Sequence, residues 1–370
     1  MRFPRRSRAL LALVLAVAGA AAPQKKKNKE EQTQTLQLPK DLPGSVTGNT
    51  RRLTFHVTPL STRGLLSPQI REALKALSHQ CGNETVLKIR AFVAGSGDVR
   101  RVRDLVSEFF TDHKQPLPAL TLVRAGGLPL EGAQVVLEAI AAARKDVNPH
   151  GLALISAQTA TAENPLAPVA PLAANSLAGL RQAVEAAGAQ PDDVLRVTCF
   201  LSSLDKLDAI RLLVAGSYPK AALDFVQTQR SPNHALAACE AVARLSADPA
   251  DAVRLFDPAG LPPEAGESQI ALVNAPEVVL TGAQASFGFQ EQDARLAFER
   301  LEKELQQAGS STQKVVFSHS YPLSQSIAAQ VRRIAPTFFD RAHPPAGSLL
   351  LFEGLPSMDA GFAVDVVAVR

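Results

Sequence analysis

Apolar and polar residues alternate between two kinds of pattern along this chain, and the alternation occurs three times. Each round begins with a short run rich in β-branched and other apolar residues, which is typical of a strand. It continues with apolar residues at every third or fourth position, which predicts an amphipathic helix ending at a glycine. The strands are expected at 53–60, 151–160 and 277–286, and the helices at 69–82, 175–188 and 296–309.

The second half of each round also keeps a fixed order. A second strand is expected at 86–95, 194–203 and 314–323, and a second helix at 98–110, 206–218 and 327–339. A proline-marked turn then opens two last strands, the second of which carries one carboxylate: Glu138, Glu240 or Asp365. From the helix-ending glycine to the acid the separations are 56, 52 and 56 residues. This agreement over several elements indicates an internal repeat.

The repeat divides the chain into three α+β units, expected at 51–145, 146–246 and 269–370. A polar linker at 23–50 precedes them, and a segment rich in proline and glycine at 247–268 links the last two. Each unit is predicted to be a sheet with two helices on one face. Because the strands are apolar on both faces, the face without helices must also be covered. We expect the three sheets to cover one another around a barrel-like core, with one acid near each junction.

The net charge of +4 comes from the first residues of the chain. Residues 1–29 hold eight Lys and Arg and no acid, so the remaining 341 residues have 31 basic and 35 acidic side chains, a net charge of −4. A body of this charge gives no support to nucleic-acid binding. Residues 1–22 combine a basic start with a short apolar run, which is typical of a secretory signal peptide. We therefore expect export to the periplasm or outside, with an uncleaved membrane anchor as the alternative, and no other membrane span.

Cysteine and histidine do not suggest a metal centre. The three cysteines have no metal-ligand spacing; one disulfide is possible, but Cys199 and Cys239 lie in apolar runs where small buried thiols are expected. The histidines are scattered and form no ligand set. His319 lies on an expected strand, where it is either a base or a satisfied, partly buried side chain. We expect no metal and no cofactor.

Several short motifs, in the same order in the three units, resemble the Rid family, also called YjgF or endoribonuclease L-PSP. They are Ser156-Ala157-Gln158, Gly282-Ala283-Gln284, the helix end at 183–188, the segment 194–213, FFTDH at 109–113 and LEAIA at 137–141. The resemblance implies the chorismate mutase-like fold, which family members assemble into homotrimers with ligand clefts between subunits. This chain would then be a monomer that is a single-chain pseudo-trimer.

The resemblance also implies a reaction and its residues. Active family members hydrolyse enamines and imines such as 2-iminobutanoate and 2-iminopropanoate, using a glutamate on the last strand and an arginine that holds the substrate carboxylate. Glu240, Glu138 and Asp365 align with the glutamate, and Gln158 and Gln284 are candidate ligand-binding residues or hydrogen-bond fillers. The arginine is absent from all three units, since its positions hold Leu120, Ala221 and Gly347. Arg124, four residues beyond Leu120, is a candidate substitute charge.

Two hypotheses follow for the function. One is an enamine or imine hydrolase, or a relative acting on a substrate without a carboxylate, with its chemistry at clefts between units. The alternative is a non-catalytic protein that binds a small ligand or a partner in these clefts. For the three acids, a purely structural role, paired or hydrogen-bonded where the units meet, is the alternative to catalysis. The family resemblance favours the hydrolase, whereas the missing arginine and the expected export favour the non-catalytic hypothesis.

Overall fold

Three sheets that share a core strand order organise the computed structural model, which describes residues 39–264 and 266–370. In each sheet the order is first, last, second and third strand of the unit; the second and third strands run parallel, and the other neighbours antiparallel. We call the units first, second and third in chain order. In sheet order, the core strands of the first unit are β2 (Leu53–Val57), β5 (Val135–Ala142), β3 (Thr85–Val93) and β4 (Ala119–Arg124). Those of the second unit are β6 (Leu152–Ala162), β9 (Ala235–Arg244), β7 (Val194–Leu201) and β8 (Ala222–Gln227). Those of the third unit are β12 (Glu277–Thr281), β16 (Phe362–Val369), β14 (Val315–Ser320) and β15 (Ala346–Leu349).

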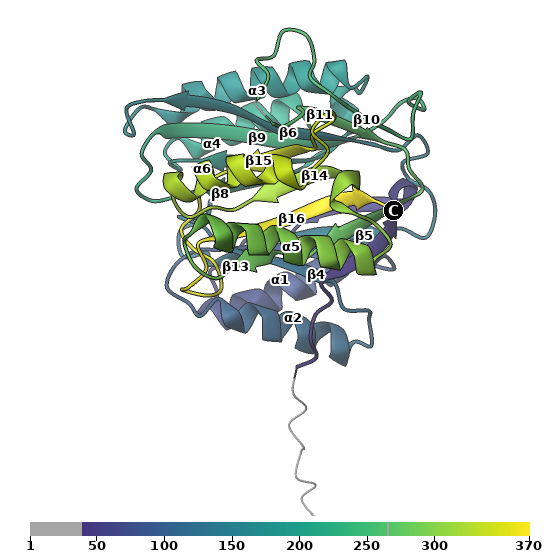
Figure 1. Cartoon of the computed structure of the whole chain (residues 1–370). Helices are drawn as coiled ribbons and strands as arrows, with labels where there is room; N and C mark the ends of the chain where they lie inside the picture. The colour runs from purple at the N-terminus through teal and green to yellow at the C-terminus, as the bar shows by residue number, and fades with distance from the viewer. Residues whose placement is uncertain (1–38, 265) are drawn as a thin grey trace, which may run out of the picture. The chain divides into compact units, whose positions relative to one another are not determined.

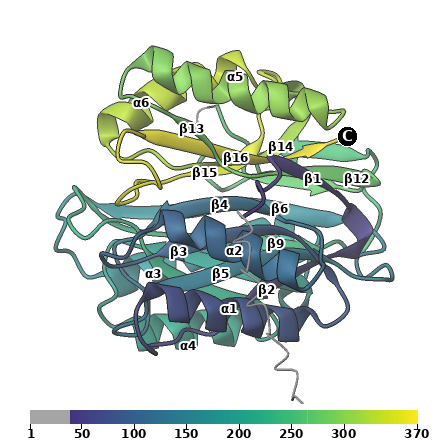
Figure 2. The same ribbon diagram turned by 90° about the horizontal axis from the view of Figure 1, so that it is seen from below.

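Two helices cover one face of each sheet (Figures 1 and 2). Their apolar stripes pack on the strands; Leu74 and Phe298, for example, are fully buried. Gly82 and Gly309 follow helix ends with positive φ, the backbone conformation that glycine adopts without strain. The helices are α1 (Leu66–Cys81), α2 (Arg100–Asp112), α3 (Val169–Ala186), α4 (Leu207–Ser217), α5 (Glu291–Gln307) and α6 (Gln325–Ile334), with short 3₁₀ turns at Thr50–Arg52, Pro191–Asp193, Thr312–Lys314 and Ala335–Thr337.

Three further strands extend the sheets beyond the predicted elements, and one predicted strand is divided in two. Strand β1 (Ser45–Asn49) pairs with β12, although its residues fall in the segment expected as a polar linker. Strand β10 (Val253–Phe256), within the other expected linker, pairs with β11 (Ile270–Val273), and β11 joins β6 of the second unit. The single strand expected at 277–286 is divided into β12 and β13 (Gln284–Ser286). The segments between units therefore complete sheet edges.

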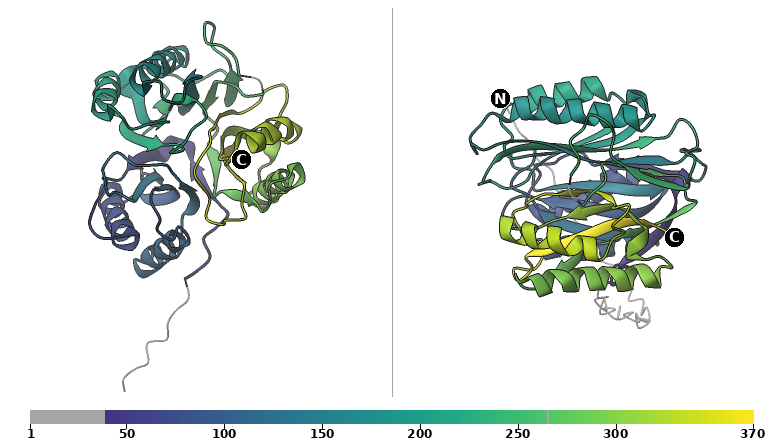
Figure 3. Two further views of the ribbon diagram at one scale, coloured as in Figure 1. Left: turned by 90° about the vertical axis from the view of Figure 1, so that its left-hand side faces the viewer. Right: turned by 45° about the horizontal axis from the view of Figure 1, so that its top comes forward.

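The helix-free faces of the sheets pack against one another. Phe92 of the first unit, Phe200 of the second and Phe352 of the third make a triangle with ring centroids 5.8–5.9 Å apart. A second apolar cluster at the same interface also combines strands of all three sheets. The helix pairs consequently lie on the outside and the strands lie between them (Figure 3).

The expectation of buried free thiols at Cys199 and Cys239 is wrong, because these two residues form a disulfide. They lie directly opposite each other on the paired strands β7 and β9, with Cα atoms 4.1 Å apart. This register could not be obtained from the sequence spacing alone. Cys81 is the free cysteine of the described residues, and it is buried.

The expected signal peptide at 1–22 and the beginning of the linker at 23–50 lie outside the described residues. Among the residues that are described, no helix combines the length and the apolar character needed to cross a membrane.

Candidate functional site

The three acids of the repeat occupy the same register in their sheets. On the neighbouring strand, Glu138 lies opposite Arg90, Glu240 opposite Thr198, and Asp365 opposite His319. The strand that carries each of these partners has a bulge a few residues earlier, which keeps the alignment the same in the three units. The acids point from the helix-free faces into the interface of the sheets. Glu138 and Glu240 are 1% exposed and Asp365 is 0% exposed, so bulk water does not reach them.

Arg90 joins the acids of the first two units. Its Nε donates to Glu138 Oε2 at 2.7 Å and its Nη2 donates to Glu240 Oε1 at 2.7 Å. Thr198 Oγ1 donates to the other oxygen of Glu138 at 2.5 Å. Both bonds of the guanidinium are charge-assisted, so Arg90 is a strong direct connection between these two sheets.

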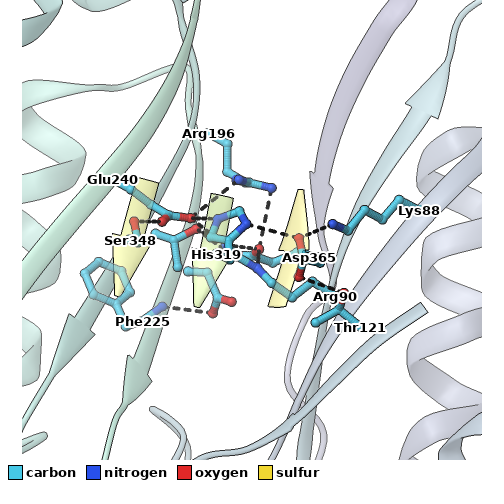
Figure 4. Close-up of polar contacts among 12 residues, drawn as sticks. Lys88, Arg90, Thr121, Arg196, Phe225, Glu240, His319, Ser348 and Asp365 are labelled. Carbon is cyan, nitrogen blue, oxygen red and sulfur yellow. Dashed lines mark hydrogen bonds and ion pairs between the residues drawn. The ribbon is translucent and has the colours of Figure 1, made fainter. Parts of the chain in front are cut away.

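His319 joins the acids of the second and third units (Figure 4). Its Nε2 lies 3.1 Å from Glu240 Oε1 and its Nδ1 lies 3.2 Å from Asp365 Oδ1. Asp365 also accepts hydrogen bonds from Lys88, from Thr121 Oγ1 at 2.8 Å and from Tyr321 Oη at 2.9 Å. Glu240 accepts a further hydrogen bond from Ser348 Oγ at 2.6 Å. The carboxylates of Glu240 and Asp365 therefore each have several donors.

These contacts keep the carboxylates ionised. Burial alone would raise the pKa of Glu138, but the charges of Arg90 and Arg196 outweigh burial and hold that pKa below its ordinary value. For Glu240 the charges of Arg90 and His319 lower the pKa well below its usual range, and for Asp365 those of Lys88 and His319 lower the pKa in the same way. A carboxyl group surrounded by apolar side chains alone has a raised pKa, and these three acids have the opposite electrostatics.

Asp224, on the same interface, behaves differently. Burial and the neighbouring carboxylate of Glu138 raise its pKa well above the ordinary value. Its Oδ1 accepts a hydrogen bond from the backbone N–H of Phe225 at 2.9 Å, whereas its Oδ2 has no partner among the described residues. Arg196 is a further cation of this ion cluster. Its Nη1 lies 3.5 Å from Glu138 Oε2, and its Nη2 lies 3.7 Å from Glu240 Oε1.

A large cleft lies between the first and third units, and none of these three acids lines it. It has a volume of about 720 Å³ and is lined on one side by Leu120 and Leu122 of β4 and on the other by Gln284 and Phe287. Arg300 lies at its edge, where it donates to the carbonyl of Ala285 at 2.6 Å and stacks on the ring of Phe287. Arg100, Arg103, Asp104 and Glu304 and the segment 42–44 complete the lining.

The other predicted ligand residues do not share this cleft. Gln158 is buried, and its side chain donates to the carbonyl of Ser156 at 3.2 Å, which is the hydrogen-bond filler role. Gly347 N donates to Ser156 Oγ at 2.8 Å across the interface between the second and third units. In the second unit the residue whose register matches Leu120 and Gly347 is Leu223 rather than Ala221.

Arg124 does not supply a charge near Leu120. Its Nη2 donates to the carbonyl of Gly95 at 2.6 Å, and it lines a separate cavity with Arg230 and Glu353. The role of a substitute for the missing arginine is therefore not supported by its position.

One cluster that sequence spacing missed lies in the first unit. His56, Cys81 and Glu84 place a nitrogen, a sulfur and an oxygen within 4.8 Å of one another. His56 Nε2 lies 2.8 Å from Glu84, which accounts for these two side chains as a hydrogen-bonded pair, and burial raises the pKa of the Cys81 thiol to about 12. In this structure the cluster is a hydrogen-bonded pair, His56 and Glu84, beside a buried cysteine.

No protein-family model matches the chain, and no curated protein matches it. Among solved structures, the chain is similar to a Rid-family protein from Yersinia pestis, with 16% identity over 32% of this chain and 100% of that one and a TM-score of 0.29. It is also similar to YjgF-family members from Mycobacterium tuberculosis (20% identity, 32% and 99% coverage, TM-score 0.24) and Neisseria meningitidis (13% identity, 32% and 94% coverage, TM-score 0.24).

Proposed function

We propose that this chain is a single-chain pseudo-trimer of three Rid-like units around a barrel-like core, and that it binds a small molecule without transforming it. The shared strand order, the shared register of Glu138, Glu240 and Asp365, and the packing of the helix-free faces support the architecture. The observation that carries the function is the buried ion cluster, which occupies the three acids completely.

A catalytic acid or base needs access to substrate and a pKa near the working pH. Glu138 and Glu240 have neither, because Arg90 binds both carboxylates and lowers their pKa values while the sheets exclude water. Moving either acid to a substrate would break a buried ion pair, at a cost of about 3–5 kcal/mol. The cluster therefore serves to hold the units together.

The cleft between the first and third units is the proposed binding site. Its volume of about 720 Å³ falls in the usual range for small-molecule sites, roughly 300–1,000 Å³. Leu120, Leu122 and Phe287 offer apolar surface, and Arg300 offers positive charge, whereas Arg103 is paired with Asp41. The two acids of the lining already have partners: Asp104 pairs with Arg101 and Glu304 accepts from Ser45. The chemistry fits a small apolar molecule with one anionic group.

An ammonia-release assay separates binding from hydrolysis. Freshly prepared 2-iminobutanoate and 2-iminopropanoate are incubated with the purified chain, and ammonia is followed by a coupled enzyme. We expect the rate in buffer alone. A faster rate that disappears in the Glu138→Gln, Glu240→Gln double variant would instead support the hydrolase.

Binding in the cleft is tested with anilinonaphthalene sulfonate, a fluorescent apolar anion. We expect one probe molecule per chain, and Arg300→Met to raise the dissociation constant about tenfold through loss of a charged contact. Arg144→Met, which removes an exposed arginine outside the cleft, is the matched control and should leave the affinity unchanged. Equal affinities for the Arg300 variant and the unmodified chain would exclude this cleft.

We also propose that the protein is exported and acts as a monomer. The leader pattern at 1–22 supports export, as does the Cys199–Cys239 disulfide, since such bonds persist in oxidising compartments. Light scattering should give the mass of one chain, at most 39.2 kDa. A mass near three chains would contradict the fusion of a complete trimer into one polypeptide.

A further inference from the structure

Three side chains that can each bind a metal meet beside the edge strand of the first sheet. His56 lies on β2, Cys81 is the last residue of α1, and Glu84 lies in the turn that follows this helix. Their nitrogen, sulfur and oxygen atoms are within 4.8 Å of one another. The backbone N–H of Glu84 donates to the carbonyl of Cys81 at 3.0 Å, so the turn fixes these two positions relative to each other.

The fold of the repeat does not require these residues, as the second unit shows. His56 and Ile155 have the same register, each opposite the residue that follows the acid of its unit. Cys81 and Ala187 each directly precede the glycine at the end of the first helix. Ile155 and Ala187 belong to the apolar core under the helices of the second unit. The first unit therefore has two metal-binding side chains at positions that apolar residues fill in the second.

The distances suit a zinc ion after small movements of the side chains. Zinc binds sulfur at about 2.3 Å and nitrogen or oxygen at about 2.0–2.2 Å, so its tetrahedral ligand atoms lie roughly 3.3–3.6 Å apart. His56 Nε2 and Glu84 Oε2 are 2.8 Å apart, and shifts of about 1 Å bring all three donors to these separations. Thr54 Oγ1 donates to Glu84 Oε2 at 2.7 Å and orients the carboxylate, as residues behind metal ligands commonly do.

An ion can reach these side chains from solvent. The side chains of His56 and Glu84 are 18% and 23% exposed, whereas Cys81 is buried behind them. His56 also borders a cavity of about 620 Å³ between the first and second units, from which water can supply a fourth ligand. Without a cation, burial and the charge of Glu84 raise the pKa of the Cys81 thiol to about 12, and a metal that binds the sulfur displaces this proton.

We propose that His56, Cys81 and Glu84 bind one Zn²⁺ ion, with water in the fourth position. Thiolate, imidazole and carboxylate together suit a borderline metal such as zinc, whereas Ca²⁺ and Mg²⁺ take oxygen ligands. The ion gives a role to the one cysteine that is outside the Cys199–Cys239 disulfide. It links the edge strand β2 to the end of α1. This site does not depend on what the cleft between the first and third units binds.

Cobalt absorption tests the ligand set on the unmodified chain. Co²⁺ replaces Zn²⁺ in such sites, and a charge-transfer band in the near ultraviolet appears when a thiolate binds it. The purified chain is treated with a chelator, dialysed without reducing agent, and titrated first with Co²⁺ and then with Zn²⁺. We expect the band to saturate at one ion per chain and to disappear as Zn²⁺ displaces Co²⁺. A titration without this band would overturn the proposal.

Equilibrium dialysis with Zn²⁺ compares variants of the ligands. Cys81→Ala and His56→Gln should each raise the dissociation constant at least about tenfold, since even loss of a residue behind the ligands has an effect of this size. His79→Gln, which removes an exposed histidine of α1 outside the cluster, is the matched control and should leave the affinity unchanged.

Cys81→Ala should fold, because Ala187 occupies the same position in the second unit, and circular dichroism checks this. Equal affinities of Cys81→Ala and the unmodified chain, or no zinc uptake by the unmodified chain, would refute the site. If Cys81→Ala does not fold, the cobalt titration of the unmodified chain decides.

Discussion

Replacing Arg90 with methionine is the perturbation that most clearly shows what the acids do. Methionine keeps much of the side-chain volume but removes the charge that joins Glu138 and Glu240. Each of the two lost hydrogen bonds is charge-assisted and contributes about 1.5–3 kcal/mol. Two carboxylates would remain buried without their principal cation, so we expect a loss of about 3–5 kcal/mol in the free energy of unfolding at pH 7. This is a large part of the 5–15 kcal/mol typical of folded domains.

The loss should depend on pH. In the unmodified chain the folded pKa values of Glu138 and Glu240 lie below the unfolded value of about 4.3. Their contribution to stability is therefore fully present above this value, and it is lost as the pH falls through the lower folded pKa values. Without Arg90 this contribution is missing, so the difference between Arg90→Met and the unmodified chain should be largest at neutral pH and should shrink below about pH 4.

Urea unfolding followed by circular dichroism at pH 7 and pH 3.5 measures both effects. Arg101→Met is the matched control, because Arg101 also joins two carboxylates, Asp104 and Glu108, but with a side chain 40% exposed on the surface. The Arg101→Met variant should lose no more than about 0.5–1 kcal/mol in the free energy of unfolding. Combining Arg90→Met with Glu240→Gln should recover part of the stability, since one unpaired charge is removed. A cost for Arg90→Met no larger than that for Arg101→Met would refute the reasoning.

Two further predictions concern Asp224 and the cysteines. The folded pKa of Asp224 lies above its unfolded value of about 3.9, so the free energy of unfolding falls as the pH rises above that value. Asp224→Asn, which cannot ionise, should be more stable than the unmodified chain by at least about 1 kcal/mol at pH 8 and equal to it near pH 4. Guanidinium unfolding at both pH values measures this difference, and a variant less stable than the unmodified chain at pH 8 would contradict the prediction. The unfolded protein, prepared without reducing agent, should react with one equivalent of a thiol reagent, at Cys81, and with three after reduction of Cys199–Cys239. Three equivalents before reduction would exclude the disulfide.

Much of the fold could be predicted because long periodic segments carry a strong signal. The helices and the first two strands of each unit lie where they are predicted, mostly with bounds within a few residues. Helices α3 and α5 start six and five residues earlier than predicted, and α6 and β12 end five residues earlier. Strands β1 and β10 were not predicted, since each has only four or five residues and lies in a polar or proline-rich segment. They form through pairing with β12 and β11, and pairing partners cannot be obtained from local patterns.

The candidate site was predicted in part. The acids stood out as single charges in apolar strands, whereas Lys88 and Arg90 were overlooked although they alternate on one face of the equally apolar strand β3. Two cations at this spacing in a buried strand predict a partner of opposite charge, and this signal was available in the sequence. The contacts of His319 with two units, and the position of Gln158 outside the cleft between the first and third units, depend on tertiary packing and cannot be obtained from the sequence.

The ionisation of Glu138 and Glu240 tests the central claim most directly. Carbon-13 NMR of the chain labelled at the glutamate carboxyl carbon follows each group through a pH titration, with Glu138→Gln and Glu240→Gln providing the assignments. We expect both signals to remain at the ionised position below pH 4, where exposed glutamates have already titrated. A signal from either residue that titrates between pH 6 and 7, as a general acid or base would, contradicts the structural role of the cluster.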